Sequence, residues 1–181
     1  MRLFIAIDLP AEVVERLDRL IADLRPRARI HWSPAANLHI TTKFIGQWPE
    51  ERLTELNRAL GALGGRTPIA VRVAGLGFFP NPKSPRVFWA GVDASPELSR
   101  LAVEIDQALS KLGVAPETRA YSPHLTLARI KEPSQAATLP KDLGAPDFGS
   151  FTADRFHLYL SKPGRSGSVY TKLSEFPFTT S

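Results

Sequence analysis

The sequence contains no cysteine among its 181 residues. This absence excludes disulfide bonds and zinc sites built on thiolate ligands. It is consistent with a reducing compartment, where thiols are not paired into disulfides. We therefore expect a cytoplasmic protein that folds without covalent cross-links.

Long apolar segments are also missing. No stretch approaches the roughly 20 apolar residues that a helix needs to cross a bilayer. The apolar run near the N-terminus, from Leu3 to Ile7, is too short for a signal peptide, and Asp8 interrupts it. We expect no membrane association.

The composition that remains is ordinary for a globular protein, with a surplus of basic residues. Hydrophobic residues make up 43% and charged residues 23% of the chain, as is typical of globular domains. The length predicts a single domain over residues 1–181, built as two lobes that share a core. The formal net charge of +5 favours an anionic partner such as nucleic acid, although solubility alone accounts for such a charge equally well.

The order of apolar patterns predicts strands alternating with helices. Apolar residues at helical spacing predict helices that begin after Pro10, Pro49 and Ser95. Apolar runs predict strands over residues 3–7, 30–32, 38–45, 69–73, 87–92 and 124–130. The order strand, helix, then His-x-Thr strand occurs twice, which indicates an internal duplication with a pseudo-twofold axis.

The remaining segments are predicted from their turn residues. Residues 75–86 are rich in Gly, Pro and Ser and predict a loop. Residues 131–150 are expected to be mostly loop, with one helical turn near Ser134–Thr138. The last two predicted strands, 156–160 and 169–173, form a hairpin around Lys162-Pro163-Gly164-Arg165.

Two short strings place a histidine two residues before a threonine: His39-Ile40-Thr41 and His124-Leu125-Thr126. Residues i and i+2 of a strand point to the same face, so each string presents an imidazole beside a hydroxyl. The pseudo-twofold axis would bring the two strands face to face. We therefore expect one cleft that contains both histidines.

Acidic residues are absent around both strings. None lies between Asp23 and Glu50, and none between Glu117 and Glu132. Histidine sites for divalent metals usually include carboxylates, and a Ser-His-Asp triad needs an acid to orient its imidazole. The sequence therefore argues against a metal, a cofactor and a triad, and a basic, hydroxyl-lined pocket suits a phosphate.

A pair of histidines suits proton transfer in both directions. The ordinary pKa of an imidazole is about 6.5, so near neutral pH one ring can be protonated while the other is neutral. One ring then takes a proton from water and the other gives a proton to a leaving oxygen, each transfer being worth about 10²–10⁴ in rate. Threonine hydroxyls and a cation would stabilise charge on the phosphate oxygens.

The segments around both strings resemble the 2H phosphoesterase superfamily, which is named for two His-x-Thr/Ser-x motifs. Residues 38–46 resemble its first motif with the trailing Phe-aliphatic-Gly, and residues 122–129 resemble its second. Residues 2–7 and 87–92 are also similar, so the resemblance spans nearly the whole chain. The branch that it resembles comprises the RNA 2′,3′-cyclic phosphodiesterases, historically called 2′-5′ RNA ligases.

The resemblance implies an α+β fold that is bilobal and duplicated, with two antiparallel sheets facing each other across a central cleft and helices on the outside. By position, His39 corresponds to the proton donor to the departing 3′ oxygen. His124 corresponds to the base, or proton acceptor, that activates water. Thr41, Thr126 and Arg129 correspond to phosphate contacts.

The implied reaction is metal-independent hydrolysis of terminal 2′,3′-cyclic phosphates on RNA to 2′-phosphates, and we expect a monomer. Some members of the family join tRNA halves through a reversible 2′-5′ linkage, so ligation is an alternative. Hydrolysis of small cyclic phosphates and non-catalytic RNA binding are further alternatives. The sequence does not choose among them.

Two further side chains are candidates for substrate binding. Lys43 has the strand parity of His39 and Thr41, so it either contacts the phosphate or is a solvated strand lysine. Tyr121 precedes the second motif and either stacks on a base, since every base offers a π-face, or belongs to the core.

The remaining polar positions near the motifs carry other expectations. Arg129 has odd spacing from His124, so its role requires a β-bulge or a side chain that reaches around the strand end. Thr42 replaces a leucine that is common in the family and is expected to affect packing. His31 and His157 have no partner threonine, and we expect them to be ordinary polar residues.

Overall fold

The computed structural model of the protein describes residues 1–140, 142 and 144–179. Its strands form two antiparallel sheets. The first sheet has the order β3-β1-β8-β9 and consists of β1 (Arg2–Ile7), β3 (Ile40–Gln47), β8 (Arg155–Gly164) and β9 (Gly167–Pro177). The second has the order β2-β6-β5-β4-β7 and consists of β2 (His31–Trp32), β4 (Ile69–Phe79), β5 (Val87–Ala94), β6 (His124–Arg129) and β7 (Asp147–Ala153).

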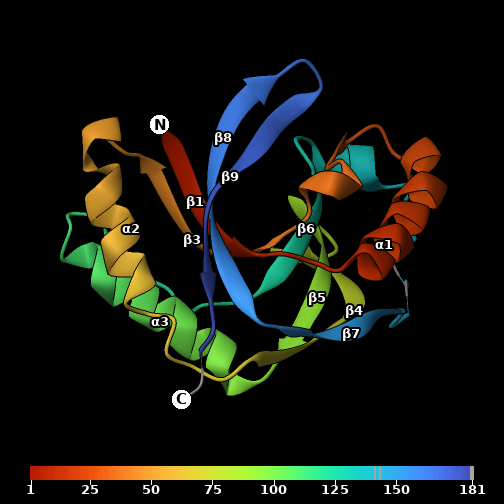
Figure 1. Ribbon diagram of the computed structural model, residues 1–181. Coiled ribbons are helices and arrows are strands. Elements are labelled where there is room, and N and C mark those ends of the chain that lie inside the picture. Colours follow the sequence, from red (N-terminus) through yellow and green to blue (C-terminus); the bar gives the residue numbers. More distant parts are fainter. Residues whose placement is uncertain (141, 143, 180–181) are drawn as a thin grey trace.

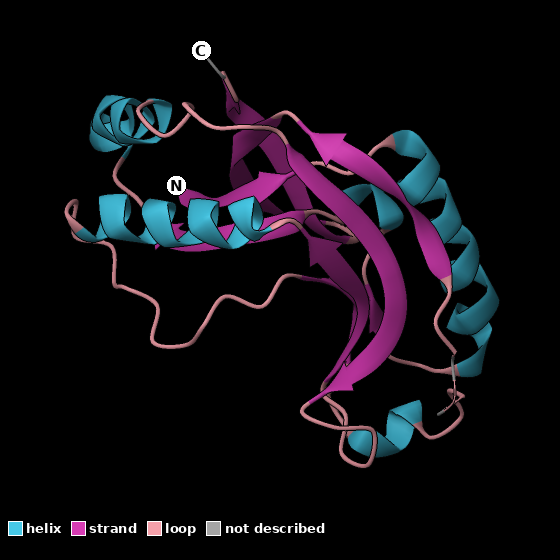
Figure 2. Ribbon diagram, turned by 90° about the horizontal axis from the view of Figure 1, so that it is seen from below, coloured by secondary structure: helices cyan, strands magenta, loops and turns pink. Residues whose placement is uncertain are grey.

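Helices flank the two sheets on either side (Figures 1 and 2). The α-helices are α1 (Ala11–Leu24), α2 (Leu53–Gly61) and α3 (Pro96–Ser110). Short 3-10 helices span Arg25–Arg27, Ala35–Asn37, Glu50–Arg52 and Pro133–Ala136. The α+β fold with two antiparallel sheets and outer helices is therefore confirmed, as is the helical turn expected near residue 134.

The two predicted units have the same strand pairing. β1 pairs with the first motif strand, β3, and β5 pairs with the second, β6. The helices are exchanged between the sheets, because α1 contacts β7 of the five-stranded sheet whereas α3 contacts β3 of the four-stranded sheet. Figure 1 shows α1 on one flank and α2 and α3 on the other. Each sheet is thus covered by a helix that follows a strand of the other sheet.

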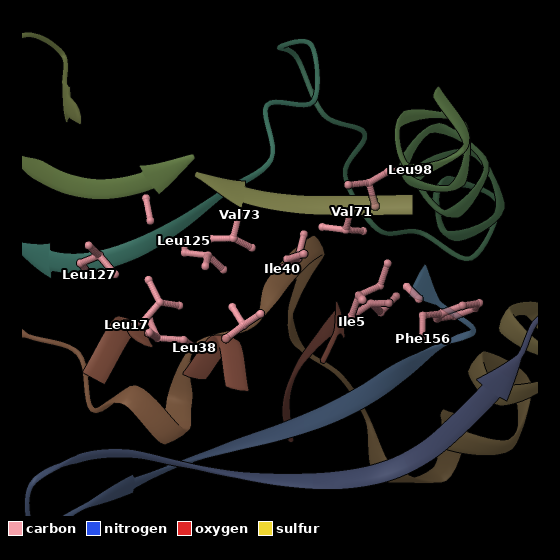
Figure 3. Close-up of a cluster of buried hydrophobic side chains, with 14 of the residues drawn as sticks. Ile5, Leu17, Leu38, Ile40, Val71, Val73, Leu98, Leu125, Leu127 and Phe156 are labelled. Atoms are coloured by element: carbon pink, nitrogen blue, oxygen red, sulfur yellow. The ribbon is translucent and has the colours of Figure 1, made fainter. Parts of the chain in front are cut away.

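A shared apolar cluster explains why the sheets and helices stay together. Helix α1 buries Val13, Leu17, Ile21 and Leu24, which recur at helical spacing along one face. Figure 3 shows Leu17 beside Leu38 and near Leu125 of the five-stranded sheet, with Ile40 and Ile5 of the four-stranded sheet farther along the same cluster. Full burial of such a side chain contributes about 1.5–3 kcal/mol, so the cluster holds the two sheets in a fixed relation.

The prediction of a loop over residues 75–86 is wrong for its first part. Strand β4 continues to Phe79 and pairs with β5 through this stretch. Gly75 has a φ of +79° at the register shift between Val73 and Leu76, and a Cβ on Gly77 would lie 2.1 Å from the Trp89 ring. These glycines serve a bulge and a packed aromatic ring instead of a turn.

The described part of residues 131–150 is mostly loop, as expected, but the prediction missed strand β7, which begins at Asp147 and continues to Ala153. It pairs with β4 along the sheet edge. Gly149 has a φ of +119°, and a Cβ there would lie 2.8 Å from the Arg16 side chain of α1. The glycine therefore allows α1 to approach the strand closely, although it weakens the strand pattern in the sequence.

The final hairpin is confirmed, but its turn lies later than predicted. The β8–β9 ladder continues to the pair Gly164–Gly167, which leaves Arg165 and Ser166 as the turn. The pairing of β1 with β8 ends at Ser161. Pro163 therefore lies in a two-stranded arm beyond β1, where its missing N–H interrupts no ladder with a second neighbour. The arm projects from the sheet in Figure 1.

Candidate active site

One cleft of about 630 Å³ lies between the two sheets and is lined by residues of both motifs. His39 and Thr41 belong to the first motif, and His124 and Thr126 to the second. The tip of the β8–β9 arm closes one side with Ser168 and its neighbours. Folding therefore brings the two His-x-Thr strings to a common cavity, as the duplication predicted.

Both histidines are held in the same way. The Nδ1 of His39 lies 3.0 Å from the Asn37 carbonyl, and the Nδ1 of His124 lies 2.9 Å from the Ser122 carbonyl. A carbonyl only accepts hydrogen bonds, so each Nδ1 must carry the proton. Each Nε2 is therefore the nitrogen that remains for proton exchange.

The surroundings of His39 are aromatic and enclosed. Its ring centroid lies 4.6 Å from that of Tyr159, 5.9 Å from Tyr170 and 6.3 Å from Phe4. The side chain is 12% exposed. Burial lowers the pKa of His39 because the charged ring loses solvation, and the nearby Asp8 carboxylate opposes this effect.

Asp8 is a residue that the sequence reasoning did not assign to the site. It directly follows β1, and its Oδ1 lies 3.7 Å from the Nε2 of His39. Tyr159 donates a hydrogen bond to Asp8, and the Nζ of Lys172 lies 2.5 Å from its Oδ2. Burial raises the pKa of Asp8, but these two donors outweigh it and hold the pKa below its usual value. The one feature of the sequence that could have pointed to Asp8 is its place as an acid directly after the continuous apolar run Leu3–Ile7.

The surroundings of His124 are different. Its ring is half-buried and meets the ring of Phe79 edge to face at 5.2 Å. Phe79 packs in turn on Trp89 at 5.2 Å. Among the described residues, no carboxylate lies within ion-pair distance of His124.

Lys43 still lines the cleft, but it lies on the opposite face of its strand from Thr41, so the predicted shared face is wrong. Thr41 pairs with Ala6 and Lys43 pairs with Ile5, with a register shift between the two pairs. Thr42 is the extra residue of this β-bulge, and its buried hydroxyl donates to the Ile5 carbonyl at 3.1 Å. A bulge breaks the period-two alternation on which the prediction relied.

The ammonium of Lys43 is fully engaged within the protein. Its Nζ donates to Asp106 at 2.7 Å, to the Ala115 carbonyl at 2.9 Å and to Glu117 at 2.9 Å. Three bonds use all the donors of an ammonium group. Burial lowers the pKa of Lys43, but the two carboxylates outweigh it and raise the pKa above its ordinary value. Lys43 thus ties β3 to α3 and has no donor left for a phosphate.

Arg129 reaches the cleft side of its strand through a second bulge. Thr126 pairs with Trp89 and Arg129 pairs with Val87, again with a register shift between the pairs. Val87 and Trp89 are two residues apart on β5 and share a face, so Arg129 lies on the same face as Thr126. The bulge that its expected role required is therefore present, and the exposed guanidinium lines the cleft.

Tyr121 also lines the cleft, but its hydroxyl is hydrogen-bonded to the backbone and does not face the cavity as a free donor. Its hydroxyl donates to the Thr41 carbonyl at 2.8 Å, and its ring packs against the main core cluster. Burial raises the pKa of this hydroxyl well above its usual range. The contact joins the segment before the second motif to the strand of the first. Stacking of Tyr121 on a base stays a prediction.

The other two histidines occupy contrasting places. His31 is exposed, pairs with Arg129 between β2 and β6, and lines the same cleft. His157 is 3% exposed behind Asp8, with its Nδ1 3.6 Å from the Asp8 carboxylate. Their spacing gave no reason to place either one near the motifs.

The described residues offer neither a metal site of carboxylates and histidines nor a membrane-spanning helix. No group of three or more His, Asp and Glu side chains in that part of the chain is arranged to hold a metal ion. None of its helices has the length and apolar character that membrane crossing requires.

Comparison with known proteins agrees with this geometry. A family model described as the 2′-5′ RNA ligase superfamily matches residues 10–165. An RNA 2′,3′-cyclic phosphodiesterase of Methanocaldococcus jannaschii is 36% identical over 183 aligned residues, covering 97% of this chain and 100% of the relative.

Solved structures extend the similarity to the fold. A crystal structure of a Thermus thermophilus protein has a TM-score of 0.84 at 30% identity and covers 99% of both chains. Escherichia coli LigT in complex with 3′-AMP has a TM-score of 0.80 at 30% identity, covering 99% of this chain and 98% of that one. The family model and the archaeal relative both match most of the chain, so this protein belongs to the 2′-5′ RNA ligase superfamily of 2H phosphoesterases.

Proposed function

We propose that this protein is a cyclic phosphodiesterase that opens the terminal 2′,3′-cyclic phosphate of RNA to a 2′-phosphate. The archaeal relative is named for this activity, and the structurally similar LigT is solved with a ribonucleotide, 3′-AMP. The observation that carries the proposal is the cleft in which His39 and Thr41 of the first motif and His124 and Thr126 of the second lie together. Such a cavity suits one phosphate held between an acid and a base.

In the proposed reaction, His124 is the general base and His39 the general acid. The Nε2 of His124 takes a proton from water as the water oxygen forms a bond to phosphorus. The bond from phosphorus to the 3′ oxygen breaks, and the Nε2 of His39 gives its proton to that oxygen. The products are a 2′-phosphate and a 3′-hydroxyl, and solvent restores both rings. Each proton transfer is worth about 10²–10⁴ in rate.

The hydroxyls of Thr41 and Thr126 and the guanidinium of Arg129 are proposed to bind the non-bridging phosphate oxygens. A guanidinium offers two parallel donors that match a phosphate. Arg129 is suited to this role because it shares a face with Thr126 and lines the cleft. Negative charge that develops on the phosphate is stabilised by donors that are already in place.

RNA is the proposed substrate because exposed cations line the cleft. Arg119 and Arg129 line it, whereas the lining acids Asp106 and Glu117 are bonded to Lys43. The whole chain carries a formal charge of +5. Binding of an RNA backbone to such a surface weakens with salt. Hydrolysis of a long RNA should therefore fall with rising salt more steeply than hydrolysis of a cyclic mononucleotide. Equal salt dependence would favour small cyclic phosphates as the substrate class.

The decisive assay uses an oligoribonucleotide with a 2′,3′-cyclic phosphate end in the presence of a chelator. We expect turnover without added metal, a 2′-phosphate product, and loss of activity in His39→Ala and in His124→Ala. Arg100→Ala, on an exposed face of α3 in a pair with Glu97, is the matched control and should keep full activity. Wild-type turnover in either histidine variant, or a requirement for added divalent metal, would contradict the proposal.

Ligation and simple binding are separated by the same preparation. Paired tRNA halves incubated with the protein would yield a 2′-5′ junction if the cleft favours the reverse reaction. Tight RNA binding with no product at high protein concentration would indicate a non-catalytic module.

A further inference from the structure

The Asp8 carboxylate is held in place by side chains of β8 and β9, two neighbouring strands of the four-stranded sheet. Tyr159 and Lys172 are directly opposite each other in the β8–β9 ladder, and both contact Asp8. The contact to Lys172 is 2.5 Å. Side chains paired across a ladder lie on the same face, so Tyr159 and Lys172 fix the carboxylate from one side of the sheet.

The fixed carboxylate faces the reactive nitrogen of His39. Asp8 Oδ1 lies 3.7 Å from the Nε2 of His39. This is too long for a hydrogen bond, and it leaves Nε2 available to another partner. The distance is short enough for a strong charge interaction in an enclosed site. The effect of Asp8 on the ring is therefore electrostatic.

The aromatic surroundings make this charge effective. Phe4, Tyr159 and Tyr170 surround the His39 ring and keep water away from it. A charged imidazole in such a place loses solvation and needs a compensating negative charge. Among the described residues, Asp8 is the only carboxylate within ion-pair distance of His39.

We propose that Asp8 is a positioning residue that favours the imidazolium form of His39 and so assigns the role of acid to this histidine. The inference rests on the proposed two-histidine reaction. Asp8 stays ionised throughout, because Tyr159 and Lys172 already donate to its oxygens. The proton moves only from the Nε2 of His39 to the departing oxygen. The other titratable groups around the ring are His157 and Tyr159 on β8 and Tyr170 and Lys172 on β9.

The test compares charge changes of opposite sign. Asp8→Asn should move the high-pH limb of kcat/KM to lower pH by roughly 0.5–1 unit, because the neutral ring then forms at lower pH. On that limb kcat/KM should fall about 3–10-fold. Lys172→Met removes a positive charge beside Asp8 and should move the limb the other way, by less because Lys172 is 54% exposed.

A control and a direct readout make the test independent of folding. Glu175→Gln removes a carboxylate that contacts His157 but not His39, and it should leave the limb in place. The NMR titration of the His39 ring should shift in the same sense as the limb in each variant. Unfolding in urea identifies a variant that has lost its structure.

The outcomes separate this inference from the proposed function. Opposite shifts for Asp8→Asn and Lys172→Met, with none for Glu175→Gln, would support the positioning role. Unchanged titration in both variants, or shifts in the same direction, would overturn it even where His39→Ala is inactive. An active His39→Ala would instead overturn the proposed function.

Discussion

His39 and His124 each donate Nδ1–H to the carbonyl two residues earlier, and each is followed by a threonine and then a β-bulge. Their surroundings differ. His39 is enclosed by aromatic rings and faces a carboxylate, whereas His124 meets one aromatic edge and no carboxylate among the described residues. The two histidines therefore share the same local backbone geometry but have different charges and burial around their rings.

The residues after the bulges diverge as well. In the first strand the bulge directs Lys43 toward α3 and places the exposed Phe44 opposite Phe4, on the cleft side. In the second strand the equivalent bulge places Arg129 on the cleft side. One motif therefore offers the cleft an aromatic ring and the other a cation. The same backbone feature, a β-bulge after the motif, thus presents different side chains to the cleft from the two strands.

The largest expected effect separates the acid from the base. His39→Ala and His124→Ala should each slow hydrolysis of a cyclic phosphate by about 10²–10⁴. With a 3′-deoxynucleoside 2′-(p-nitrophenyl phosphate), the leaving group departs without a proton. His39→Ala should then return to within about tenfold of wild type, whereas His124→Ala should stay impaired. Equal rescue of both variants would mean that the two sites are chemically equivalent.

The next effect tests Arg129, the residue that the second bulge turns to the cleft. Arg129→Ala should lower kcat by about 10²–10³, the usual loss when a charge-stabilising donor is removed. Arg129→Lys should recover part of that rate, because it restores the charge without the two parallel donors. Steady-state kinetics on the cyclic phosphate end measures both. A change confined to KM would place Arg129 in ground-state binding alone.

Lys43 gives a smaller effect, on stability. Lys43→Met should lower the free energy of unfolding by about 1–3 kcal/mol, because charged hydrogen bonds to Asp106 and Glu117 are lost. Both carboxylates can then turn to solvent, which limits the cost. Urea unfolding measures it. A loss of kcat larger than that of Arg129→Ala, in a folded variant, would show that Lys43 acts on the phosphate after all.

The smallest effect concerns the link between the motifs. Tyr121→Phe removes the hydrogen bond to the Thr41 carbonyl and should lower stability by about 0.5–1.5 kcal/mol. Thr42→Val removes a hydroxyl bond to Ile5 within one sheet and is the matched comparison. We expect kcat to fall more in Tyr121→Phe than in Thr42→Val, because only the former bond joins the two motifs. The reverse order would argue against Tyr121 as a link.

Much of the fold could be predicted because apolar patterns are strong where one face of a helix or both faces of a strand are buried. The apolar spacing of α1 and the continuous apolar run of β1 are examples. The prediction failed at the end of β4 and in β7, where glycines serve a bulge, a ring contact and a close helix approach. In a sequence, a glycine inside a strand looks the same as a glycine in a loop, so the sequence pattern alone could not distinguish β4 and β7 from loops.

The candidate site shows a similar division. The paired His-x-Thr strings were visible in the sequence and line one cleft. Strand parity misplaced Lys43 and left Arg129 in doubt, since register shifts depend on the partner strand and are not written in a single strand. Asp8 lies 31 positions before His39 in the chain, so the absence of acids near the motif concealed the acid near the ring.

The amino-acid sequence by itself determined the two histidine strings, the helix and strand periods that carry them, and the basic charge. These depend on neighbours along the chain, whose side chains a strand or helix places at fixed intervals. Only the tertiary structure decided which groups surround each ring, because sheet pairing and packing bring Asp8 and Tyr159 to His39 and Lys172 to Asp8. The desolvation and charge that make one imidazole differ from the other arise from those distant contacts.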